Sequence, residues 1–334
     1  MTRFFLLHGG ALGDCVLALH FADIVKRLLA ADRVVVAARS SVVHWARRVG
    51  WIDEAITLDA SRSRGRVAAE NGRAAARKEL DTEFDVVVSM VGLPKPELLE
   101  QLGIRSNARV VTIDPREESP GAGGGRHIMA QWIGRFEESC AAQGFAGEML
   151  TNRPLFDPTS SAFRPDRAYR ATGRAALARE LQVDDGRLIV IVHPGSGSAR
   201  KCPPIEVMES LVDELVEGAK ANVAWMIGPD EWERHGETFH QRLSRRAPVL
   251  WREDVENAAD LVAGADVYIG MDSGMTHVAA VCSRRTVAIF GPTDPAVWRP
   301  IGDSCEIVGF PADLRDPSCA RGWLRGIRDA LRSG

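Results

Sequence analysis

The 334-residue sequence lacks the long apolar runs that mark membrane-spanning and secreted chains. No stretch reaches the roughly 18 uninterrupted apolar residues that a membrane-spanning helix needs. The N-terminal run MTRFFLLHGGALGD also lacks the extended apolar region and the small-residue cleavage site of a signal peptide. We therefore expect a cytoplasmic protein without a transmembrane segment, either free or peripheral to the inner membrane.

The sequence also lacks paired cysteines and a net positive charge. The six cysteines form no C-x-x-C pair and have no matching histidine spacing, which excludes the usual patterns of zinc sites and disulfide frameworks. We expect reduced thiols that are mostly buried. The net charge of −3 argues against nucleic-acid binding, since such proteins usually carry clustered Lys and Arg. Any anionic ligand must therefore be bound locally.

Short β-rich runs alternate with longer amphipathic runs in both halves of the chain. Strand–helix alternation predicts a parallel sheet with helices on both faces. A chain of 334 residues also exceeds the roughly 250–300 residues at which a single core stops growing, so we predict two doubly wound α/β domains. The runs are 4–7, 16–29, 34–38, 42–49, 84–89 and 110–113, then 188–192, 207–217, 223–227, 230–245, 267–269 and 286–290.

A segment without apolar periodicity separates the two halves. Residues 152–167 contain three prolines and several Ser, Thr and Asp residues, a composition typical of interdomain linkers. We place the boundary near Ser160. The predicted parts are an N-terminal domain at 1–160, a C-terminal domain at 161–310, and a helical tail at 311–334 that packs back across the domains.

A glycine-rich turn, Gly9-Gly10-Ala11-Leu12-Gly13-Asp14, stands between an apolar strand and an amphipathic helix. Glycines let the backbone turn tightly and let a ligand approach closely. Neither G-x-G-x-x-G nor G-x-x-x-x-G-K-[ST] occurs there, and Arg39 rather than an acid follows the second strand, which makes NAD unexpected. Two interpretations of Asp14 stay open: a first-turn acid stabilised by the helix dipole, or a general base facing the cleft between the domains.

A second loop, HPGSGSARK at 193–201, follows a buried-strand run. Its small residues expose backbone N–H groups to a diphosphate, and Lys201 adds a point charge. An ordinary turn is the alternative, but only five of the 42 basic residues are lysines, so Lys201 favours a ligand site. Pro203 and Pro204 are expected to open the next helix. The candidates for donor binding are His193, Pro194, Gly195, Ser196, Gly197 and Ser198.

A third motif, MDSGMTHVAA at 271–280, places polar residues where a strand ends and a helix begins. Singly, Asp272 is more often a helix cap and His277 more often a core histidine. Together they predict a phosphate cradle at a helix N-terminus. The candidates here are Asp272, Ser273, Gly274, Met275, Thr276 and His277. In a fourth segment, 287–295, a plain strand exit and a ligand contact are equally supported.

These motifs in this order, GALGD, HPGSGS with its lysine, MDSGMTHVAA and then IFGPTDP, resemble the signature set of glycosyltransferase family 9, the ADP-heptose:lipopolysaccharide heptosyltransferases. The resemblance runs from about residue 4 to residue 300. It implies a GT-B architecture, in which two Rossmann-like domains face a central cleft, the acceptor binds mainly to the first domain and an ADP-sugar mainly to the second.

The same resemblance implies roles for individual residues. Asp14 would deprotonate the acceptor hydroxyl, Lys201 and the 272–277 segment would hold the donor diphosphate, and Glu231 would contact the adenosine ribose. Gly13 of the GALGD motif belongs with the donor contacts. The implied reaction is an inverting transfer with no cofactor and no metal, and no D-x-D pair stands near the predicted phosphate site.

The partners implied are a nucleotide-sugar donor and a glycan or glycolipid acceptor at the inner membrane surface, without nucleic acid. Two departures from the family stand out. Pro203 stands where the family's K-x-W-P motif has tryptophan. No clear basic acceptor motif occurs in the first domain, unless the arginines of 62–77 supply it; a solvated helix face explains these equally well. They are Arg62, Arg64, Arg66, Arg73 and Arg77.

Two other functions are weighed beside this one. The first is a protein that binds a sugar nucleotide on a GT-B scaffold without transferring it, because a fold alone does not fix a function. The second is an NADP-dependent oxidoreductase that uses 9–13 together with Arg39. It ranks last because it leaves the HPGSGS and MDSGMTH motifs unexplained.

Overall fold

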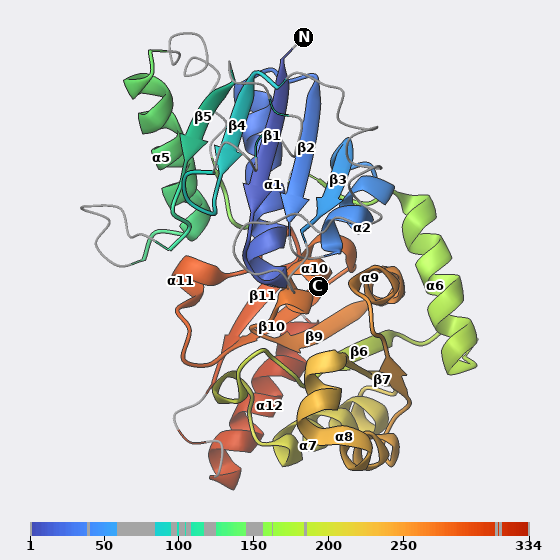
Figure 1. Ribbon diagram of the computed structural model, residues 1–334. Helices are drawn as coiled ribbons and strands as arrows, with labels where there is room; N and C mark the ends of the chain where they lie inside the picture. Colours follow the sequence, from blue (N-terminus) through green and yellow to red (C-terminus); the bar gives the residue numbers. More distant parts are fainter. Residues whose placement is uncertain are drawn as a thin grey trace. The chain divides into compact units, whose positions relative to one another are not determined.

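The computed structural model describes residues 2–38, 41–58, 84–94, 99, 104, 108–116, 125–144, 156–161, 163–183, 186–310, 313 and 316–332. The chain divides into two compact units, Met1–Asp157 and Pro158–Gly334 (Figure 1). The boundary expected from the sequence was Ser160. The Arg-rich segment 61–78, with its five arginines, lies outside the described residues.

The N-terminal unit contains a five-stranded parallel sheet in the order β3-β2-β1-β4-β5. The first strand is central, and His8 at its end pairs in register with Ala38. Because parallel strands share one carboxyl edge, the loops that follow β1 and β4 begin side by side. The strands are β1 (Arg3–His8), β2 (Arg33–Ala38), β3 (Glu54–Thr57), β4 (Val86–Ser89) and β5 (Arg109–Thr112).

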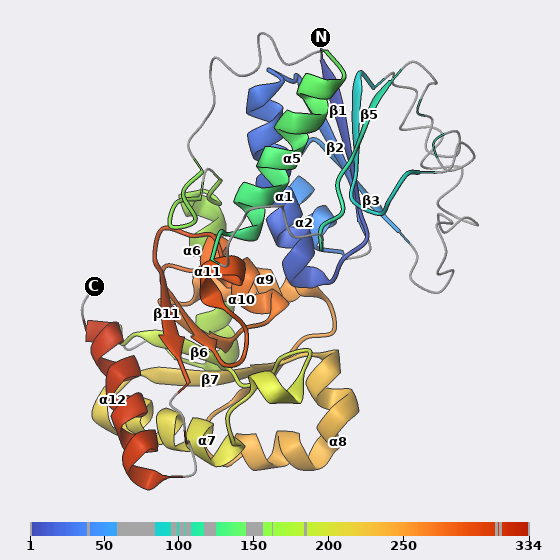
Figure 2. The ribbon, with the colours of Figure 1, turned by 90° about the vertical axis from the view of Figure 1, so that its left-hand side faces the viewer.

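Alternate residues of β1 point to opposite faces of this sheet. Phe5 and Leu7 belong to one apolar cluster, where Phe5 meets Phe84 edge-on at 5.2 Å between ring centroids. His8 points to the other face and approaches Trp132. Figure 2 shows α1, α2 and α5 on that other face, where α1 packs against both α2 and α5. Their bounds are α1 (Leu12–Leu28), α2 (Val42–Arg48) and α5 (Ile128–Ala142).

The C-terminal unit contains a six-stranded parallel sheet in the order β11-β10-β9-β6-β7-β8. Renumbered from its first strand, this order is 6-5-4-1-2-3, the doubly wound arrangement whose ligands bind at the carboxyl ends of the strands. The strands are β6 (Ile189–His193), β7 (Asn222–Ile227), β8 (Val249–Trp251), β9 (Val267–Met271), β10 (Thr286–Phe290) and β11 (Cys305–Gly309).

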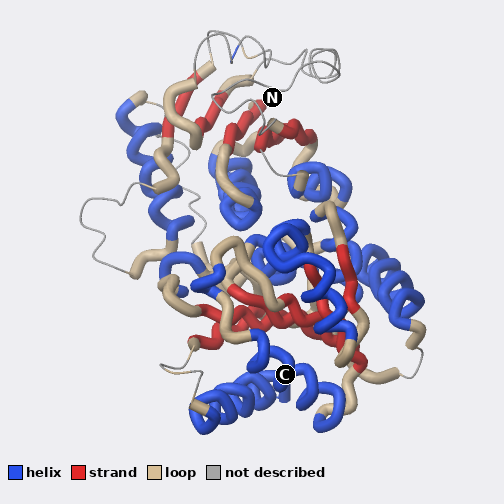
Figure 3. The backbone as a smooth tube through the Cα atoms, turned by 60° about the horizontal axis from the view of Figure 1, so that its bottom comes forward, coloured by secondary structure: helices blue, strands red, loops and turns tan. Residues whose placement is uncertain are grey.

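Helices cover both faces of this second sheet (Figures 1 and 2), and they alternate with the strands along the chain (Figure 3). One face carries α7, α8 and α12, whose apolar side chains join the main core cluster. The other carries α9 and α10, with α6 packed on α9. The bounds are α6 (Arg167–Leu181), α7 (Ile205–Asp213), α8 (Pro229–Ser244), α9 (Val255–Gly264), α10 (Gly274–Cys282), α11 (Pro295–Trp298) and α12 (Pro317–Arg332).

One detail of the C-terminal unit differs from expectation. Pro204 is the residue before α7 rather than part of it, because Ile205 is the first helical residue. Within this unit, α12 packs on the main core cluster, and Trp323 donates its indole N–H to the Gly309 carbonyl at 2.9 Å. The prediction of two doubly wound parallel-sheet domains is confirmed.

Candidate active site

Asp14 is the third residue of α1, at the carboxyl end of β1. Its carboxylate accepts a hydrogen bond from the Ala11 N–H at 3.3 Å, and the side chain is partly exposed. A Cβ atom at Gly10 would lie 2.8 Å from Asp14 Oδ2 and 2.5 Å from His8 Nε2. Glycine is therefore needed at position 10, and Asp14 serves as a first-turn acid whether or not it also acts as a base.

His8 lies beside this turn and is fully buried. Among the described residues, neither of its ring nitrogens has a hydrogen-bond partner. Burial lowers the pKa of His8 from 6.5 to about 4, because the charged imidazolium is poorly solvated there. His8 is consequently a neutral imidazole at physiological pH.

The 193–198 loop and the 272–277 motif meet in the C-terminal unit. Ser196 is buried, and its hydroxyl donates to the Asp272 carbonyl at 2.6 Å. Arg234 donates to the Ser196 carbonyl at 3.0 Å. Lys201 Nζ lies 2.7 Å from Asp272 Oδ2, and only 7% of the Asp272 side chain is exposed. Residues about 75 positions apart are thus held together at the carboxyl ends of β6 and β9.

Glu231 contacts the same loop from the N-terminus of α8. A Cβ atom at Gly195 would lie 1.8 Å from Glu231 Oε1, while Oε2 accepts from the Gly228 N–H at 2.8 Å and lies 3.6 Å from His193 Nε2. Burial by itself raises the pKa of Glu231, but His193 and backbone N–H groups outweigh this effect, and the pKa is lowered. Glu231 is therefore a buried, ionised acceptor.

The N-terminus of α10 exposes only part of the predicted phosphate cradle. Ser273, Gly274 and Met275 are partly exposed, whereas Thr276 and His277 are buried. Thr276 donates its hydroxyl proton to the Met271 carbonyl, and its oxygen lies 3.2 Å from the Ser273 hydroxyl. The exposed N–H groups of a helix N-terminus attract anions, so the first three of these residues are the ones a diphosphate can reach.

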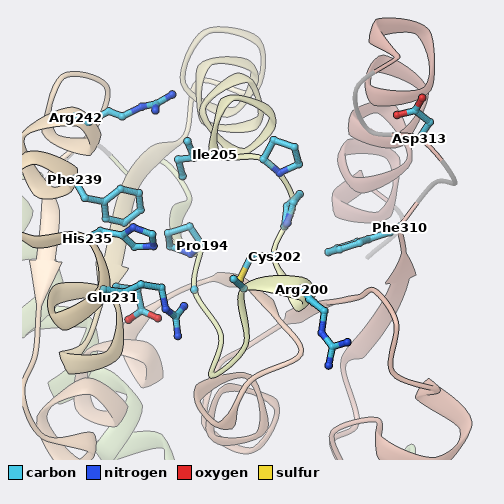
Figure 4. Close-up of a pocket in the computed structure, with 15 residues that line it drawn as sticks. Pro194, Arg200, Cys202, Ile205, Glu231, His235, Phe239, Arg242, Phe310 and Asp313 are labelled. Carbon is cyan, nitrogen blue, oxygen red and sulfur yellow. The ribbon is translucent and has the colours of Figure 1, made fainter.

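A pocket of about 680 Å³ opens beside Glu231 in the C-terminal unit (Figure 4). Ligand pockets typically measure about 300–1,000 Å³. Of the predicted donor residues, Pro194, Gly195 and Glu231 line it, whereas Lys201 and Asp272 do not. The other lining residues are Ala199, Arg200, Cys202, Pro203, Pro204, Ile205, Arg234, His235, Phe239, Arg242, Phe310 and Asp313.

The structure adds polar residues that the sequence analysis did not select. Arg234 lies three residues after Glu231 and therefore on the same face of α8, a spacing from which it was predictable. Tyr268 accompanies His193 through a 2.8 Å contact between its hydroxyl and Nδ1, and no sequence spacing indicates that pairing. In the fourth segment, Asp294 caps α11 by accepting a hydrogen bond from the Ala296 N–H.

Gly13 and Asp14 belong to the N-terminal unit, and the other predicted site residues belong to the C-terminal unit. All six cysteines are unpaired. In the described ranges, no three His, Cys, Asp or Glu side chains are grouped as a metal site would require. The helices seen there include none with the length and hydropathy to cross a bilayer.

Comparison with known proteins gives consistent matches. Residues 155–319 match the sequence profile of Glycosyltransferase family 9 (heptosyltransferase). Lipopolysaccharide heptosyltransferase 1 of Escherichia coli (strain K12) is 25% identical over 311 residues, which cover 90% of this chain and 84% of that enzyme.

Two solved structures share the fold over the whole chain. The family 9 glycosyl transferase from Veillonella parvula DSM 2008 aligns with a TM-score of 0.69 and 14% identity, covering 100% of this chain and 98% of that one. The E. coli heptosyltransferase WaaC with ADP aligns with a TM-score of 0.65 and 16% identity, covering 98% and 100%. Taken with the motifs and the two Rossmann-like domains, these matches place the chain in glycosyltransferase family 9, with the GT-B fold.

Proposed function

We propose that this glycosyltransferase moves a heptose, or a related sugar, from an ADP-sugar to a lipopolysaccharide-core or other surface-glycan acceptor, with inversion and without a metal. One observation carries the proposal. The HPGSGS loop, Lys201 and the start of α10 converge on Asp272 in the C-terminal unit. Nearly all of the residues that match the family profile belong to this unit.

The diphosphate would bind at the N-terminus of α10. Its first N–H groups have no partners within the helix and carry the positive end of the helix dipole. Lys201 supplies the mobile charge: its side chain is 32% exposed and now neutralises Asp272. On binding, the ammonium would be shared between Asp272 and the phosphate oxygens, which supports the metal-free character of the proposed transfer.

The nucleoside would bind beside Glu231. Its carboxylate is buried, ionised and lines the pocket, and a carboxylate oxygen of this kind accepts hydrogen bonds from ribose hydroxyls. The similarity to a heptosyltransferase whose structure contains ADP supports adenosine diphosphate as the carrier.

In the proposed reaction, the acceptor hydroxyl oxygen attacks the anomeric carbon of the sugar. The bond from that carbon to the diphosphate oxygen breaks, and its electron pair leaves with ADP. Asp14 takes the hydroxyl proton as general base. Charge that develops on the leaving diphosphate is stabilised by Lys201 and by the α10 N–H groups. Attack opposite the leaving group inverts the anomeric centre.

The acceptor is proposed from the relatives. E. coli lipopolysaccharide heptosyltransferase 1 takes its name from lipopolysaccharide, so we place the acceptor, a glycan or glycolipid, at the inner membrane surface and the enzyme in the cytoplasm or peripheral to that surface. The acceptor-binding side chains would belong to the N-terminal unit, beside Asp14.

Thermal stability with ligands tests the donor. The protein is heated alone and with saturating ADP, UDP, GDP or NADP, with and without chelator. A ligand at 100 times its dissociation constant adds about 2.7 kcal/mol to the free energy of unfolding. Stabilisation by ADP alone, unaffected by chelator, supports the proposal, whereas a response to NADP alone overturns it. Stronger stabilisation by UDP or GDP would show that the donor carries that nucleotide instead of ADP. Loss of the ADP effect in the presence of chelator would show that ADP binding depends on a metal.

Turnover then separates transferase from binding protein. The capping bond from Ala11 to Asp14 is the observation that favours a non-catalytic scaffold, because it gives Asp14 a structural task. Transfer of heptose from ADP-heptose to a lipopolysaccharide-core acceptor, with the anomeric product configuration read by NMR, decides between the two. ADP binding without any transfer, and without change in Asp14→Asn, would show the scaffold function.

A further inference from the structure

A line of buried polar side chains runs behind the donor site of the C-terminal unit. Glu231 Oε2 lies 3.6 Å from His193 Nε2, and His193 Nδ1 lies 2.8 Å from the Tyr268 hydroxyl. The Tyr268 ring and Thr276 Oγ1 both lie against Gly270, and the Thr276 oxygen lies 3.2 Å from the Ser273 hydroxyl. The line thus joins the carboxylate proposed to hold the ribose to the helix start proposed to hold the diphosphate.

The sheet explains why these side chains meet. His193 and Tyr268 lie on the neighbouring strands β6 and β9, where Ile191 pairs with Tyr268 and His193 with Gly270. Both side chains project to the face opposite the main core cluster. A Cβ atom at Gly270 would lie 2.5 Å from the Tyr268 ring and 2.7 Å from Thr276 Oγ1, so the glycine makes room for this contact.

Proton positions along the line are constrained by chemistry. Burial raises the pKa of Tyr268 well above its usual value, so Tyr268 is a neutral phenol with one proton to donate. Neutral imidazole has one N–H and one acceptor nitrogen. Only the Nε2–H tautomer of His193 turns a donor toward the ionised Glu231, and that tautomer leaves Nδ1 as acceptor for the Tyr268 proton.

We propose that Tyr268 is a positioning residue of the donor site: by donating to His193 Nδ1 it fixes the Nε2–H tautomer, which holds Glu231 Oε2 and leaves Oε1 directed at the ribose hydroxyls. The proposal rests on the proposed function for the identity of the ligand. Its geometry is independent of that function, because Oε2 is held by Gly228 and His193 while Oε1 is the atom nearest Gly195.

The chain provides a matched control for the test. It contains two tyrosines, and the other, Tyr169, donates to Asp260 Oδ1 at 2.6 Å in the same unit. Tyr268→Phe and Tyr169→Phe therefore each remove one phenolic hydrogen bond. Only the first removes a bond to His193.

The first measurement needs no nucleotide. The ring ¹⁵N shifts of His193 are recorded at pH 8, where an ordinary imidazole is neutral. We expect the Nε2–H tautomer in the wild type and in Tyr169→Phe, and a substantial Nδ1–H population in Tyr268→Phe. An unchanged tautomer in Tyr268→Phe, or an equal change in both variants, overturns the proposal.

The second measurement uses ADP and 2′,3′-dideoxy-ADP, which lacks the ribose hydroxyls. Losing one neutral hydrogen bond should weaken ADP binding by about three- to tenfold in Tyr268→Phe, with no change for the dideoxy analogue. In a Glu231→Gln background, Tyr268→Phe should add no further loss. Equal weakening of both nucleotides would show a general structural defect and would refute the positioning role.

The two failures can be told apart. A wild-type protein that binds ADP and its dideoxy analogue equally would contradict the proposed ribose contact of Glu231, while the His193 tautomer would still decide whether Tyr268 sets that ring. If the protein binds ADP more tightly than the dideoxy analogue but Tyr268→Phe leaves the His193 tautomer unchanged, the proposed donor site stands and Tyr268 has no positioning role in it.

Discussion

The two units place a glycine against a carboxylate at the end of their first strand, but they surround it differently. In the N-terminal unit, Gly10 lies against Asp14, whose partly exposed carboxylate accepts a hydrogen bond from the Ala11 N–H. In the C-terminal unit, Gly195 lies against Glu231, a buried carboxylate held by His193 and Gly228.

This difference follows the chemistry proposed for each unit. A base must take a proton from the acceptor hydroxyl, so its carboxylate has to be within reach of that ligand, and Asp14 is partly exposed. A carboxylate that only orients a ribose gains from burial beside hydrogen-bond donors such as His193 and the Gly228 N–H, because these donors fix its position and keep it ionised. The same sheet topology therefore supports two different uses of one residue type.

The largest expected effect is a loss of turnover caused by a substitution in the N-terminal unit. Asp14→Asn should lower the turnover number by about 10²–10⁴-fold, the usual contribution of a general base, while the dissociation constant for ADP stays unchanged. Asp23→Asn, on the same helix and paired with Arg27 at 2.8 Å, is the control. An unchanged turnover number in Asp14→Asn would show that Asp14 is not the general base.

The next effect concerns the lysine of the C-terminal unit. Lys201→Ala should weaken ADP binding by about 10–100-fold, since hydrogen bonds to charged groups contribute about 1.5–3 kcal/mol, and should leave adenosine binding unchanged. Lys26→Ala, which breaks an ion pair with Asp53 at 3.3 Å, is the matched control. Calorimetric titrations with both ligands check this, and an equal loss of adenosine affinity would contradict a phosphate role.

A third prediction uses the buried histidine of the N-terminal unit. The native pKa of His8 is lowered to about 4 from 6.5, so the unfolded chain binds an extra proton between these values, and stability falls as pH drops through that window. Between pH 8 and pH 5 the wild type should lose about 2 kcal/mol more than His8→Leu. Urea unfolding at the two pH values measures it. Parallel pH dependence in the two proteins would show that His8 is not buried neutral.

The smallest effects compare the two glycines directly. Gly195→Ala should displace Glu231 and weaken ADP binding by roughly tenfold, and Gly10→Ala should displace Asp14 and lower turnover by roughly tenfold without changing ADP affinity, each about 1.4 kcal/mol. Gly218→Ala and Gly134→Ala, where an added Cβ meets no atom within 4 Å, are the controls in the two units. If instead Gly10→Ala weakened ADP binding and Gly195→Ala lowered only turnover, the donor site would belong to the N-terminal unit and the general base to the C-terminal unit.

The strands and the motif-bearing helices were predictable because their apolar residues are continuous or periodic. The predicted run 286–290 coincides with β10, and 223–227 differs from β7 by one residue. Other elements carry little such signal. In α6, Gly173 and Leu177 are the buried residues. The helix is stabilised by a close approach to α9, where a Cβ atom at Gly264 would lie 2.3 Å from the Gly173 carbonyl carbon.

The candidate site divides in the same way. Asp14, Lys201 and Glu231 were selected from motifs, because a strand end followed by a helix start is visible in sequence. Their surroundings were not: the motif does not indicate that Thr276 and His277 are buried while Ser273, Gly274 and Met275 are partly exposed. Whether a helix residue is buried or faces a ligand depends on which elements pack against that helix.

The sequence alone determined the family, the two parallel-sheet domains and the order of the motifs along the chain, because periodicity and glycine placement are local properties. Only the tertiary structure decided which polar groups meet. Tyr268 reads as one more buried strand residue in sequence, and its hydroxyl acquires a partner because β6 and β9 pair in a register that brings His193 beside it. A hydrogen bond between residues 75 positions apart depends on that register, which is fixed by the packing of the whole sheet.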